Sequence, residues 1–405
     1  MKTIIKNGKV YYRHALVRAD LEIAEGRIAA IKQFEEAAAA EHPKTGGLTG
    51  HPGQHGEHIN GMEVSGAQVI DATGLIVSPG FLDIHTHGCA GVDVNAATAE
   101  DYEKLSRFQA SQGAVGWQAS ILTDTREQTL WCIGEYERWK KLEHRGAKLI
   151  GIHLEGPFLS PEYKGAMPEY LLRKPDLALL KEYQEAAGGD IRYITVSPEI
   201  PGVIDFIPEI RKLGITVAIG HSGADYETAC RAIAAGAAAA THTSNAMRLL
   251  HQHEPAIWGA VLEDDEVYCE MICDGRHLHP GTVRLIIKTK GLDRVVAVTD
   301  SIMAAGLPDG NYKLGVNDVV VKDGDARLAD GGSRAGSTLT AGQGFRNLLT
   351  FTGRPMEEII PILTENPARL LGLFDHIGSI EVGKDADLVL LDPSGNVVRT
   401  LVGGR

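Results

Sequence analysis

The sequence lacks the features that mark several classes of protein. It has no run of about 20 apolar residues, so nothing in it predicts a membrane-spanning helix. Its five cysteines are odd in number and scattered over 405 residues, which argues against a disulfide framework. The 40 basic residues are outnumbered by 53 acidic ones, and the net charge of −13 argues against a general binder of nucleic acid or of anionic membranes. We therefore expect a cytoplasmic protein without a nucleic-acid or membrane partner.

The two ends of the chain share a strand-like texture. Residues 1–77 alternate between apolar and polar side chains, and Asn-Gly at 7–8 and Glu-Gly at 25–26 are typical of hairpin turns. Residues 376–405 return to the same texture. We predict a small β-sandwich domain built from both termini. Its sequence is interrupted over residues 37–66 by a stretch rich in His, Gly and Pro, which we interpret as a surface loop.

The middle of the chain, residues 78–375, alternates short apolar strands with amphipathic helices. Strands are expected at 81–87, 115–121, 149–155, 193–197, 215–221, 238–242, 268–273 and 295–300. Helical spacing of apolar residues is clearest at 98–112, 126–145, 202–213 and 225–236. Eight strands joined by helices favour a (β/α)₈ barrel of the TIM type, with an open doubly wound sheet as the alternative.

Candidate metal ligands fall at the ends of these strands. The six residues are His85, His87, Glu155, His221, His242 and Asp300. Because side chains alternate along a strand, His85 and His87 point to the same face. The C-terminal ends of barrel strands converge on one mouth, so the set predicts a site for one or two ions such as Zn²⁺, Fe²⁺ or Mn²⁺. For Asp300, a helix N-cap is the alternative interpretation.

Several motifs resemble a known family. Pro-Gly-Phe-Leu-Asp-Ile-His-Thr-His at 79–87 and Gly-Ser-Ile-Glu-Val-Gly-Lys-Asp-Ala-Asp-Leu at 378–388 resemble the amidohydrolase superfamily. More narrowly, the sequence is similar to N-acetylglucosamine-6-phosphate deacetylases in five ordered motifs: His-Leu-Glu-Gly-Pro-Phe at 153–158, Gly-His-Ser at 220–222, Thr-His followed by Asn-Ala-Met within 241–247, Asp-Gly with a histidine within 274–277, and Thr-Asp at 299–300.

The resemblance implies how the ligands divide between ions. It places one divalent ion on Glu155, His221 and His242. Some family members lack the His-x-His on the first strand and bind a single ion. This chain has it, so it resembles the two-metal type, with His85 and His87 on the second ion and Glu155 bridging both.

The resemblance also implies a reaction, the hydrolysis of N-acetylglucosamine-6-phosphate to glucosamine-6-phosphate and acetate. A water activated by the metal would attack the acetyl carbonyl, with Asp300 as the general acid and base. His153 or His277 could help to polarise that carbonyl. Asn245 and Ala246 match positions at which the family contacts the substrate.

Two substrate-contacting positions depart from the family pattern. Met167 stands where the deacetylases usually have a histidine. His253 stands where they have an arginine that contacts the sugar phosphate across a dimer interface, so a homodimer is implied as well. Arg248, Arg276 and His277 lie in neighbouring motifs and are candidates to replace the missing charge.

These departures leave the substrate open. The leading hypothesis is a metal-dependent deacetylase of N-acetylglucosamine-6-phosphate, or of another N-acetylated amino sugar phosphate, in amino sugar metabolism, with zinc among the candidate metals. A second is a deacetylase of N-acetylgalactosamine-6-phosphate, of an unphosphorylated amino sugar or of an N-acyl amino acid. A third is a barrel that has kept the fold but serves only as a binding module.

Overall fold

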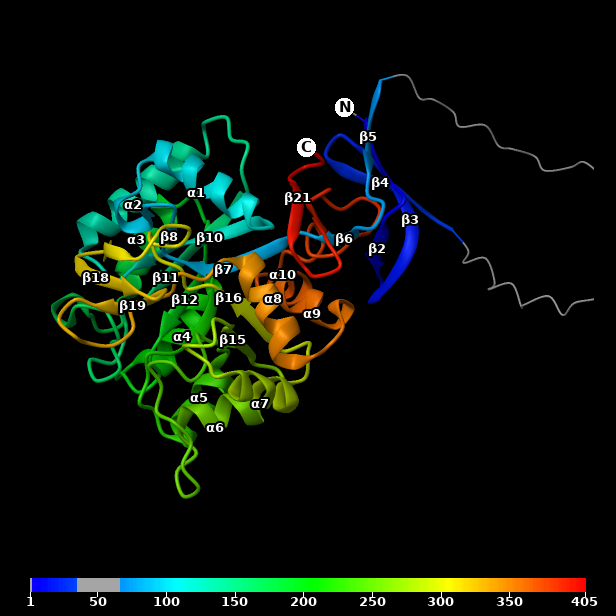
Figure 1. Cartoon of the computed structure of the whole chain (residues 1–405). Coiled ribbons are helices and arrows are strands. Elements are labelled where there is room, and N and C mark those ends of the chain that lie inside the picture. Colours follow the sequence, from blue (N-terminus) through cyan, green and yellow to red (C-terminus); the bar gives the residue numbers. More distant parts are fainter. Residues whose placement is uncertain (1, 35–65) are drawn as a thin grey trace, which may run out of the picture.

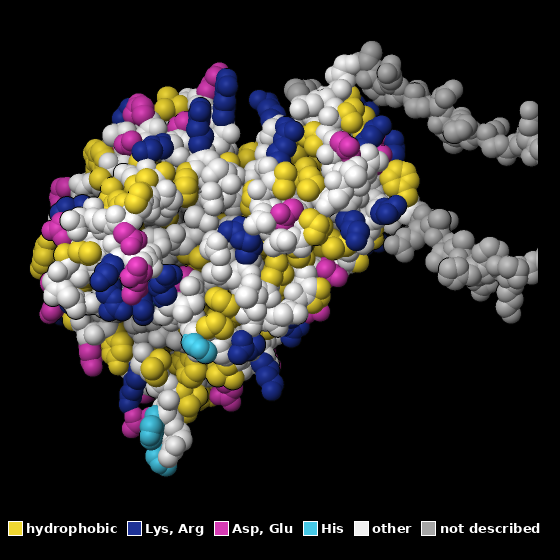
Figure 2. Space-filling model, viewed as in Figure 1, with side chains coloured by type: hydrophobic (Ala, Val, Ile, Leu, Met, Phe, Trp, Pro, Cys, Tyr) yellow, Lys and Arg dark blue, Asp and Glu magenta, His cyan; other side chains and the backbone are white. Residues whose placement is uncertain are grey.

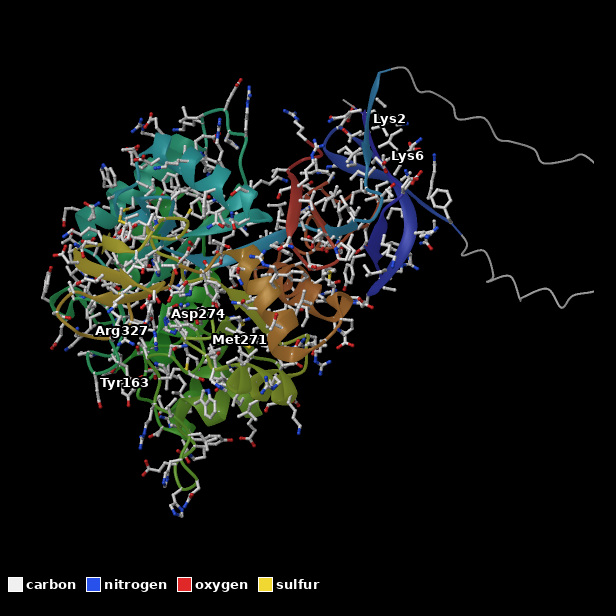
Figure 3. The ribbon with its side chains drawn as sticks, in the orientation of Figure 1. Lys2, Lys6, Tyr163, Met271, Asp274 and Arg327 are labelled. Carbon is white, nitrogen blue, oxygen red and sulfur yellow. The ribbon has the colours of Figure 1, made fainter. Side chains whose placement is uncertain are left out.

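The computed structural model describes residues 2–34 and 66–405. A barrel surrounded by helices lies beside a β domain that contains both ends of the chain (Figure 1). In Figure 3, Lys2 and Lys6 mark the β domain, well away from Tyr163 and Asp274 in the barrel. The predicted loop of residues 37–66 lies outside the described residues except for Gly66.

The barrel consists of eight parallel strands that pair in chain order. They are β7 (Phe81–Thr86), β10 (Ala114–Leu122), β11 (Lys148–Glu155), β12 (Ile191–Val196), β13 (Thr216–Ile219), β14 (Ala239–Ala240), β15 (Tyr268–Ile272) and β16 (Val295–Val298). The first and last strands also meet, because the Asp300 N–H donates to the His85 carbonyl at 2.8 Å. This contact nearly closes the sheet, which confirms the barrel and excludes the open doubly wound sheet.

Helices follow the strands and cover the outside of the barrel. They are α1 (Ala99–Ser111), α2 (Arg126–Trp139), α3 (Leu177–Ala186), α4 (Val203–Lys212), α5 (Tyr226–Ala235), α6 (Ala256–Glu263), α7 (Pro280–Lys290), α8 (Ala341–Thr352), α9 (Met356–Leu363) and α10 (Glu365–Leu370), with 3₁₀ turns at Val94–Ala96 and Glu169–Leu171. Among the helices in the described ranges, none is long and apolar enough to cross a bilayer.

Helix α2 ends earlier than predicted. The expected limit was residue 145, but the helix stops at Trp139, whose side chain is buried. Beyond it the chain carries charged residues, and Leu142 is 44% exposed. The segment after Trp139 therefore has no apolar face to hold a helix against the barrel.

The β domain is one continuous set of strands from both termini. They are β1 (Lys2–Lys6), β2 (Lys9–Tyr12), β3 (Ala15–Ala24), β4 (Arg27–Gln33), β5 (Ala67–Asp71), β6 (Ile76–Pro79), β20 (Leu388–Leu391) and β21 (Val397–Leu401). The order is β21-β20-β6-β2-β3-β1-β5, with β4 on β3. The first residues of β3 pair with β2, and its later residues pair with β1 and β4. The strands at both ends of β3 bury side chains in a common apolar core. The expected β domain is confirmed. Its limits at residues 77 and 376 stay a prediction, and β6 crosses the first.

One of the two predicted hairpins is wrong. The turn at residues 25–26 joins β3 and β4 as an antiparallel pair. Residues 7–8 instead link β1 and β2, which lie one after the other along β3. The reason is the length of β3: its ten residues pair with both short strands, so the chain steps at Asn7 (φ 65°) rather than reversing.

A small antiparallel sheet over the barrel was not predicted. It contains β17 (Gly310–Leu314), β18 (Asn317–Lys322) and β19 (Asp325–Leu328). A further hairpin pairs β8 (Gly88–Cys89) with β9 (Val92–Asp93). Val319 and Val321 of the β17–β19 sheet pack in one apolar cluster with Leu122 and Met167 of the barrel. The β17–β19 sheet therefore covers part of the barrel mouth (Figure 1).

Candidate active site

The structure brings all six predicted ligands together at the C-terminal mouth of the barrel. Glu155 is the last residue of β11, His85 lies within β7, and His87 directly follows β7. His221 lies two residues beyond the end of β13, His242 two beyond β14, and Asp300 two beyond β16. None of the six is more than 8% exposed. Parallel strands in one closed barrel bring these positions to a common point.

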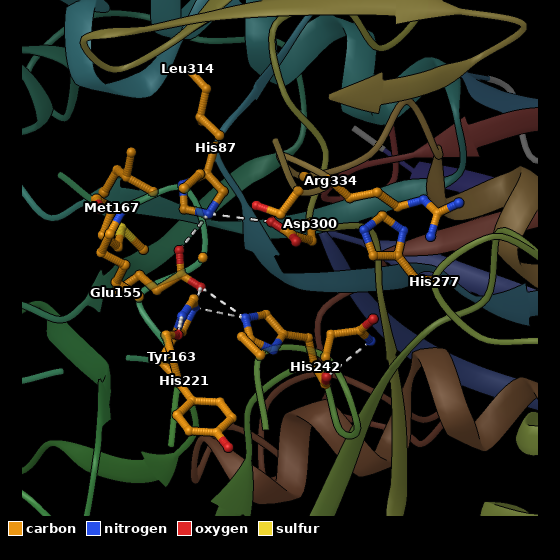
Figure 4. Close-up of a pocket in the computed structure, with 18 of the residues that line it drawn as sticks. His87, Glu155, Tyr163, Met167, His221, His242, His277, Asp300, Leu314 and Arg334 are labelled. Carbon is orange, nitrogen blue, oxygen red and sulfur yellow. Dashed lines mark hydrogen bonds and ion pairs between the residues drawn. The ribbon is translucent and has the colours of Figure 1, made fainter. Parts of the chain in front are cut away.

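Glu155 lies at the centre of the cluster. Its Oε1 is 3.1 Å from Nε2 of His221 and 3.2 Å from Nε2 of His242. Its Oε2 is 3.0 Å from Nε2 of His87 (Figure 4). Imidazole nitrogens thus lie near both carboxylate oxygens of Glu155. This is the arrangement expected of a carboxylate that could bridge two metal ions.

The cluster divides into two groups of potential ligands. One contains Glu155, His221 and His242; the other contains His85, His87 and Asp300. Within each group one ligand atom from every residue lies within 4.8 Å of the others. In the second group, Asp300 Oδ1 is 3.4 Å from Nε2 of His87 and 3.6 Å from Nε2 of His85.

The electrostatics of the cluster also fit a cation. Burial would lower the pKa values of His85 and His87, but the Glu155 and Asp300 carboxylates raise that of His85 well above its usual range and that of His87 to about 9. Burial would raise the pKa of Glu155, yet the surrounding histidines hold it well below its usual value, and the pKa of Asp300 is lowered in the same way. Negative charge that binds protons so strongly also favours a divalent ion in their place.

Hydrogen bonds fix which nitrogen each ring presents. Nδ1 of His87 bonds to the Ser120 carbonyl at 3.0 Å, and Nδ1 of His221 bonds to the Tyr163 carbonyl at 2.9 Å. A carbonyl accepts only, so these Nδ1 atoms carry the hydrogen and Nε2 is left as the ligand. In His242, Nδ1 is buried and has no partner among the described residues.

Three of the potential ligands have strained backbones. His221, His242 and Asp300 have φ values of 47°, 32° and 47°, in the left-handed region that non-glycine residues seldom adopt. Each such residue costs on the order of 1 kcal/mol or more. Left-handed residues just after β13, β14 and β16 turn the chain sharply where each strand ends, which leaves the side chain over the mouth.

A buried carboxylate below the cluster was missed by the sequence analysis. Glu270 in β15 is fully buried and accepts hydrogen bonds from three groups. They are the Tyr193 hydroxyl at 2.6 Å, Nδ1 of His85 at 3.2 Å and the His242 N–H at 3.0 Å. It therefore orients one potential ligand of each group. An acidic residue in an otherwise apolar strand is the only signal that could have found it.

His153 is not placed to polarise a substrate. Its Nδ1 is 2.9 Å from the Ser120 hydroxyl and its Nε2 is 3.0 Å from the Thr195 hydroxyl. Burial, together with the charge on His85, holds its pKa well below the usual value. Both nitrogens are thus engaged inside the barrel, so His153 is a neutral support for His85, whose ring centroid is 4.5 Å away.

A cavity of about 490 Å³ opens above the cluster. Its lining includes His87, Glu155, Tyr163, Lys164, Met167, His221, His242, Asn245, Ala246, His277, Asp300, Leu314 and Arg334. Of the predicted substrate contacts, Asn245, Ala246, Met167 and His277 thus face the same cavity as the ligands. Their roles in binding stay a prediction.

The structure does not bring the other two predicted contacts to this cavity. His253 lies on an exposed loop, and histidine side chains are visible at the tip of a protrusion in Figure 2. Arg276 is exposed, and its Nη2 donates to the Asp323 carbonyl at 2.5 Å. Arg248 forms an ion pair with Glu254 on the His253 loop. Neither Arg276 nor Arg248 is on the described lining of this cavity, and their roles in binding a phosphate stay a prediction.

A closed parallel barrel with this cluster defines a hydrolase of the amidohydrolase type, and comparison with known proteins agrees. The amidohydrolase family model matches residues 76–405. The N-acetylglucosamine-6-phosphate deacetylase of Bacillus subtilis is 37% identical over 333 residues, which cover 82% of this chain and 84% of that protein. The N-acetylgalactosamine-6-phosphate deacetylase of Escherichia coli O157:H7 is 32% identical over 347 residues, which cover 86% and 92%.

A solved structure shows the same likeness over the whole fold. A mutant N-acetyl-D-glucosamine-6-phosphate deacetylase from Mycobacterium smegmatis, in complex with N-acetyl-D-glucosamine-6-phosphate, has a TM-score of 0.85 and 32% identity. The match covers 100% of this chain and 98% of that one. The chain belongs to the amidohydrolase family and, within it, to the N-acetylglucosamine-6-phosphate deacetylases.

Proposed function

We propose that this protein removes the acetyl group from an N-acetylated amino sugar 6-phosphate, with N-acetylglucosamine-6-phosphate as the first candidate. The observation that carries this proposal is the pair of ligand groups, centred on Glu155, at the floor of one cavity. The products would be acetate and the free amino sugar phosphate. A binding module without catalysis is not favoured, because such a module would not need the buried, strained residues of the cluster.

The proposed metal would be held by residues already in position. Glu155, His221 and His242 would bind one divalent ion, Zn²⁺, Fe²⁺ or Mn²⁺, and His85 and His87 would bind a second. When bound, such ions supply an activated water and polarise the acetyl carbonyl.

Asp300 is the proposed proton carrier. Its lowered pKa keeps it a carboxylate at neutral pH, and it lines the cavity. It would take a proton from the attacking water and return that proton to the amine as the carbon–nitrogen bond breaks. The Asp300 N–H donates to the His85 carbonyl and its carbonyl accepts from the Ser337 N–H at 2.7 Å, which holds the residue in place.

The wall of the cavity at Met167 bears on which sugar is bound. Met167 is 1% exposed and packs among Leu122, Leu159 and Leu314, so this wall of the cavity is apolar. An apolar wall in place of an imidazole removes one hydrogen-bonding group for the sugar. This favours, as a second candidate, a sugar other than N-acetylglucosamine, such as its galactosamine epimer.

Comparison of kcat/KM for three substrates tests the proposal. Acetate release would be measured with N-acetylglucosamine-6-phosphate, N-acetylgalactosamine-6-phosphate and unphosphorylated N-acetylglucosamine. We expect the first to be the best substrate. A preference for the second would support the alternative sugar, and equal use of the third would contradict a requirement for phosphate. The homodimer and the cytoplasmic location also stay predictions; light scattering on the purified protein tests the former.

A further inference from the structure

A half-buried carboxylate holds the turn that follows His221, and the sequence analysis did not single it out. Glu199 lies three residues beyond the end of β12. Its Oε2 accepts from the Ser222 hydroxyl at 2.7 Å, and its Oε1 accepts from the Gly223 N–H at 2.6 Å. Ser222 and Gly223 directly follow His221 in the chain. Both oxygens of one carboxylate are thus bonded to the turn just after a potential metal ligand.

The backbone of His221 depends on contacts of this kind. Its φ of 47° lies in the left-handed region, and a residue in that region persists only where its surroundings fix it. The His221 carbonyl accepts from the Ser197 hydroxyl at 2.6 Å. Ser197 and Glu199 belong to one short segment after β12, so that segment holds both the strained residue and the two residues that follow it.

The ring of His221 is held by a loop that packs on the same turn. Nδ1 of His221 donates to the Tyr163 carbonyl at 2.9 Å, and Figure 4 shows the two residues next to each other. The Tyr163 ring lies against Gly223, because a Cβ on Gly223 would be 2.4 Å from Cε2 of Tyr163. Glu199 therefore fixes the glycine against which the loop that orients the ring is packed.

Ser222 connects this turn to a wall of the cavity. Its N–H donates to the Ala246 carbonyl at 2.9 Å, and its side chain is fully buried. Asn245 and Ala246 line the cavity together with His221. Ala246 also has a left-handed backbone, with a φ of 47°. A displacement of Ser222 would therefore move this wall as well as His221.

We propose that Glu199 is a positioning residue that holds His221 and the wall of Asn245 and Ala246 in one arrangement. Glu199 is not on the described lining of the cavity, so it acts through Ser222 and Gly223. A hydrogen bond to a charged acceptor is about twice as strong as one between neutral groups, which suits a carboxylate to this task. The inference rests on the proposed function, because that function makes His221 a metal ligand.

The same loop offers a matched control. Asp225 precedes α5, and its Oδ1 accepts from the Thr228 N–H at 2.7 Å, which caps the first turn of that helix. Asp225 is exposed and is not on the described lining of the cavity. Asp225→Ala therefore removes a carboxylate that accepts from a backbone N–H two residues beyond Gly223. It should lower stability and leave the site unchanged.

The test compares four variants with the wild type: Glu199→Ala, Glu199→Gln, Ser222→Ala and Asp225→Ala. Metal content would be measured after dialysis against a graded series of weak chelators, which needs no substrate. KM and kcat for N-acetylglucosamine-6-phosphate would then be measured with metal in excess. Melting temperatures would show how much stability each variant has lost.

We expect Glu199→Ala to bind one ion about tenfold more weakly. This is the low end of the usual loss when a group that orients a ligand is removed, because Glu199 acts through the backbone. KM should rise about fivefold, as for the loss of about one hydrogen bond, and kcat should change less. Glu199→Gln should recover most of both, since its amide oxygen can still accept from the Gly223 N–H. Ser222→Ala should be intermediate, and Asp225→Ala should differ from the wild type only in melting temperature.

The outcomes separate this inference from the proposed function. If Glu199→Ala binds metal and substrate as Asp225→Ala does, Glu199 only stabilises the fold and the inference is wrong. If Glu199→Ala does not fold, Ser222→Ala decides by the same comparison. If the wild type binds metal but deacetylates no sugar phosphate, and the Glu199 or Ser222 variant still loses an ion, the proposed function is wrong and the inference stands. A wild type that binds no divalent metal would contradict both.

Discussion

Glu270 offers the sharpest test of how the cluster is held. Its replacement by glutamine keeps the shape of the side chain and removes its charge. The amide oxygen can still accept from Nδ1 of His85 and from the His242 N–H, while the amide nitrogen can donate to the Tyr193 hydroxyl. The fold should therefore survive, and the change should be confined to the basicity of His85.

The structure also sets the size of the effect. Loss of a carboxylate behind a ligating histidine typically lowers metal affinity by about 10- to 100-fold, or about 1.4 to 2.7 kcal/mol. Because Glu270 bonds to the ring of His85 but only to the backbone of His242, the loss should fall on one ion. The ion proposed to bind Glu155, His221 and His242 should bind nearly as in the wild type.

The assay is metal content by mass spectrometry after dialysis against a graded series of weak chelators. Glu270→Gln should lose one ion at a lower chelator concentration than the wild type and keep the other. Tyr193→Phe is the control: it removes one hydrogen bond from the same carboxylate, leaves the bond to His85 intact, and should have a smaller effect. Equal loss of both ions from Glu270→Gln, or wild-type affinity for both, would refute this reasoning.

Three further predictions concern the reaction, the active-site backbone and the contact between the domains. Asp300→Asn should lower kcat by about 10²- to 10⁴-fold, because the proposed proton carrier is lost, and steady-state kinetics with metal analysis would distinguish this from loss of the ion. Gly336→Ala should destabilise the protein by about 1 to 3 kcal/mol in chemical denaturation and reduce kcat, because a Cβ at this left-handed residue (φ 60°) would lie 2.8 Å from the Asp300 carbonyl oxygen and 2.5 Å from a methyl of Ile302. Lys148→Met should lower the free energy of unfolding by about 1 to 2 kcal/mol at pH 8, because the bond of 2.6 Å between Lys148 and the buried Asp387 is lost. The loss is limited to this size because the lysine is one-third exposed. Burial would lower the pKa of Lys148, but its acidic partners raise that pKa in the folded protein. The stabilisation by the charged lysine is therefore fully present below pH 10.5 and is lost as the pH rises further. The difference in stability between variant and wild type should then shrink in alkaline solution.

The sequence was sufficient for the barrel and for the residues of the cluster. The ends of the strands in a parallel barrel all face one mouth, so histidines and acids at the ends of five of the strands can be assigned to that mouth from the sequence alone. His85 and His87 were assigned to one face by the alternation of a strand alone. The two halves of the β domain were also visible as strand texture at both ends of the chain.

The features that were missed depend on contacts distant in sequence. Glu270 lies within a strand rather than at its end, and only the closed barrel places it under His85. Arg334 follows the β17–β19 sheet, whose position over the mouth is fixed by packing against Leu122 and Met167 of the barrel. The true end of α2 depends on where the barrel surface stops. None of these contacts leaves a periodic signal along the chain.

The most direct test of the central claim is acetate release from N-acetylglucosamine-6-phosphate by the purified protein, before and after removal of metal by a chelator. The account predicts turnover that is lost with the metal and restored by Zn²⁺, Fe²⁺ or Mn²⁺. Glu155→Gln, which weakens the bridge between the two ligand groups, should stay inactive after the metal is restored. Full turnover by protein shown to contain no metal would contradict the account, and so would a metal-loaded protein that releases no acetate from any of the acetylated sugar phosphates.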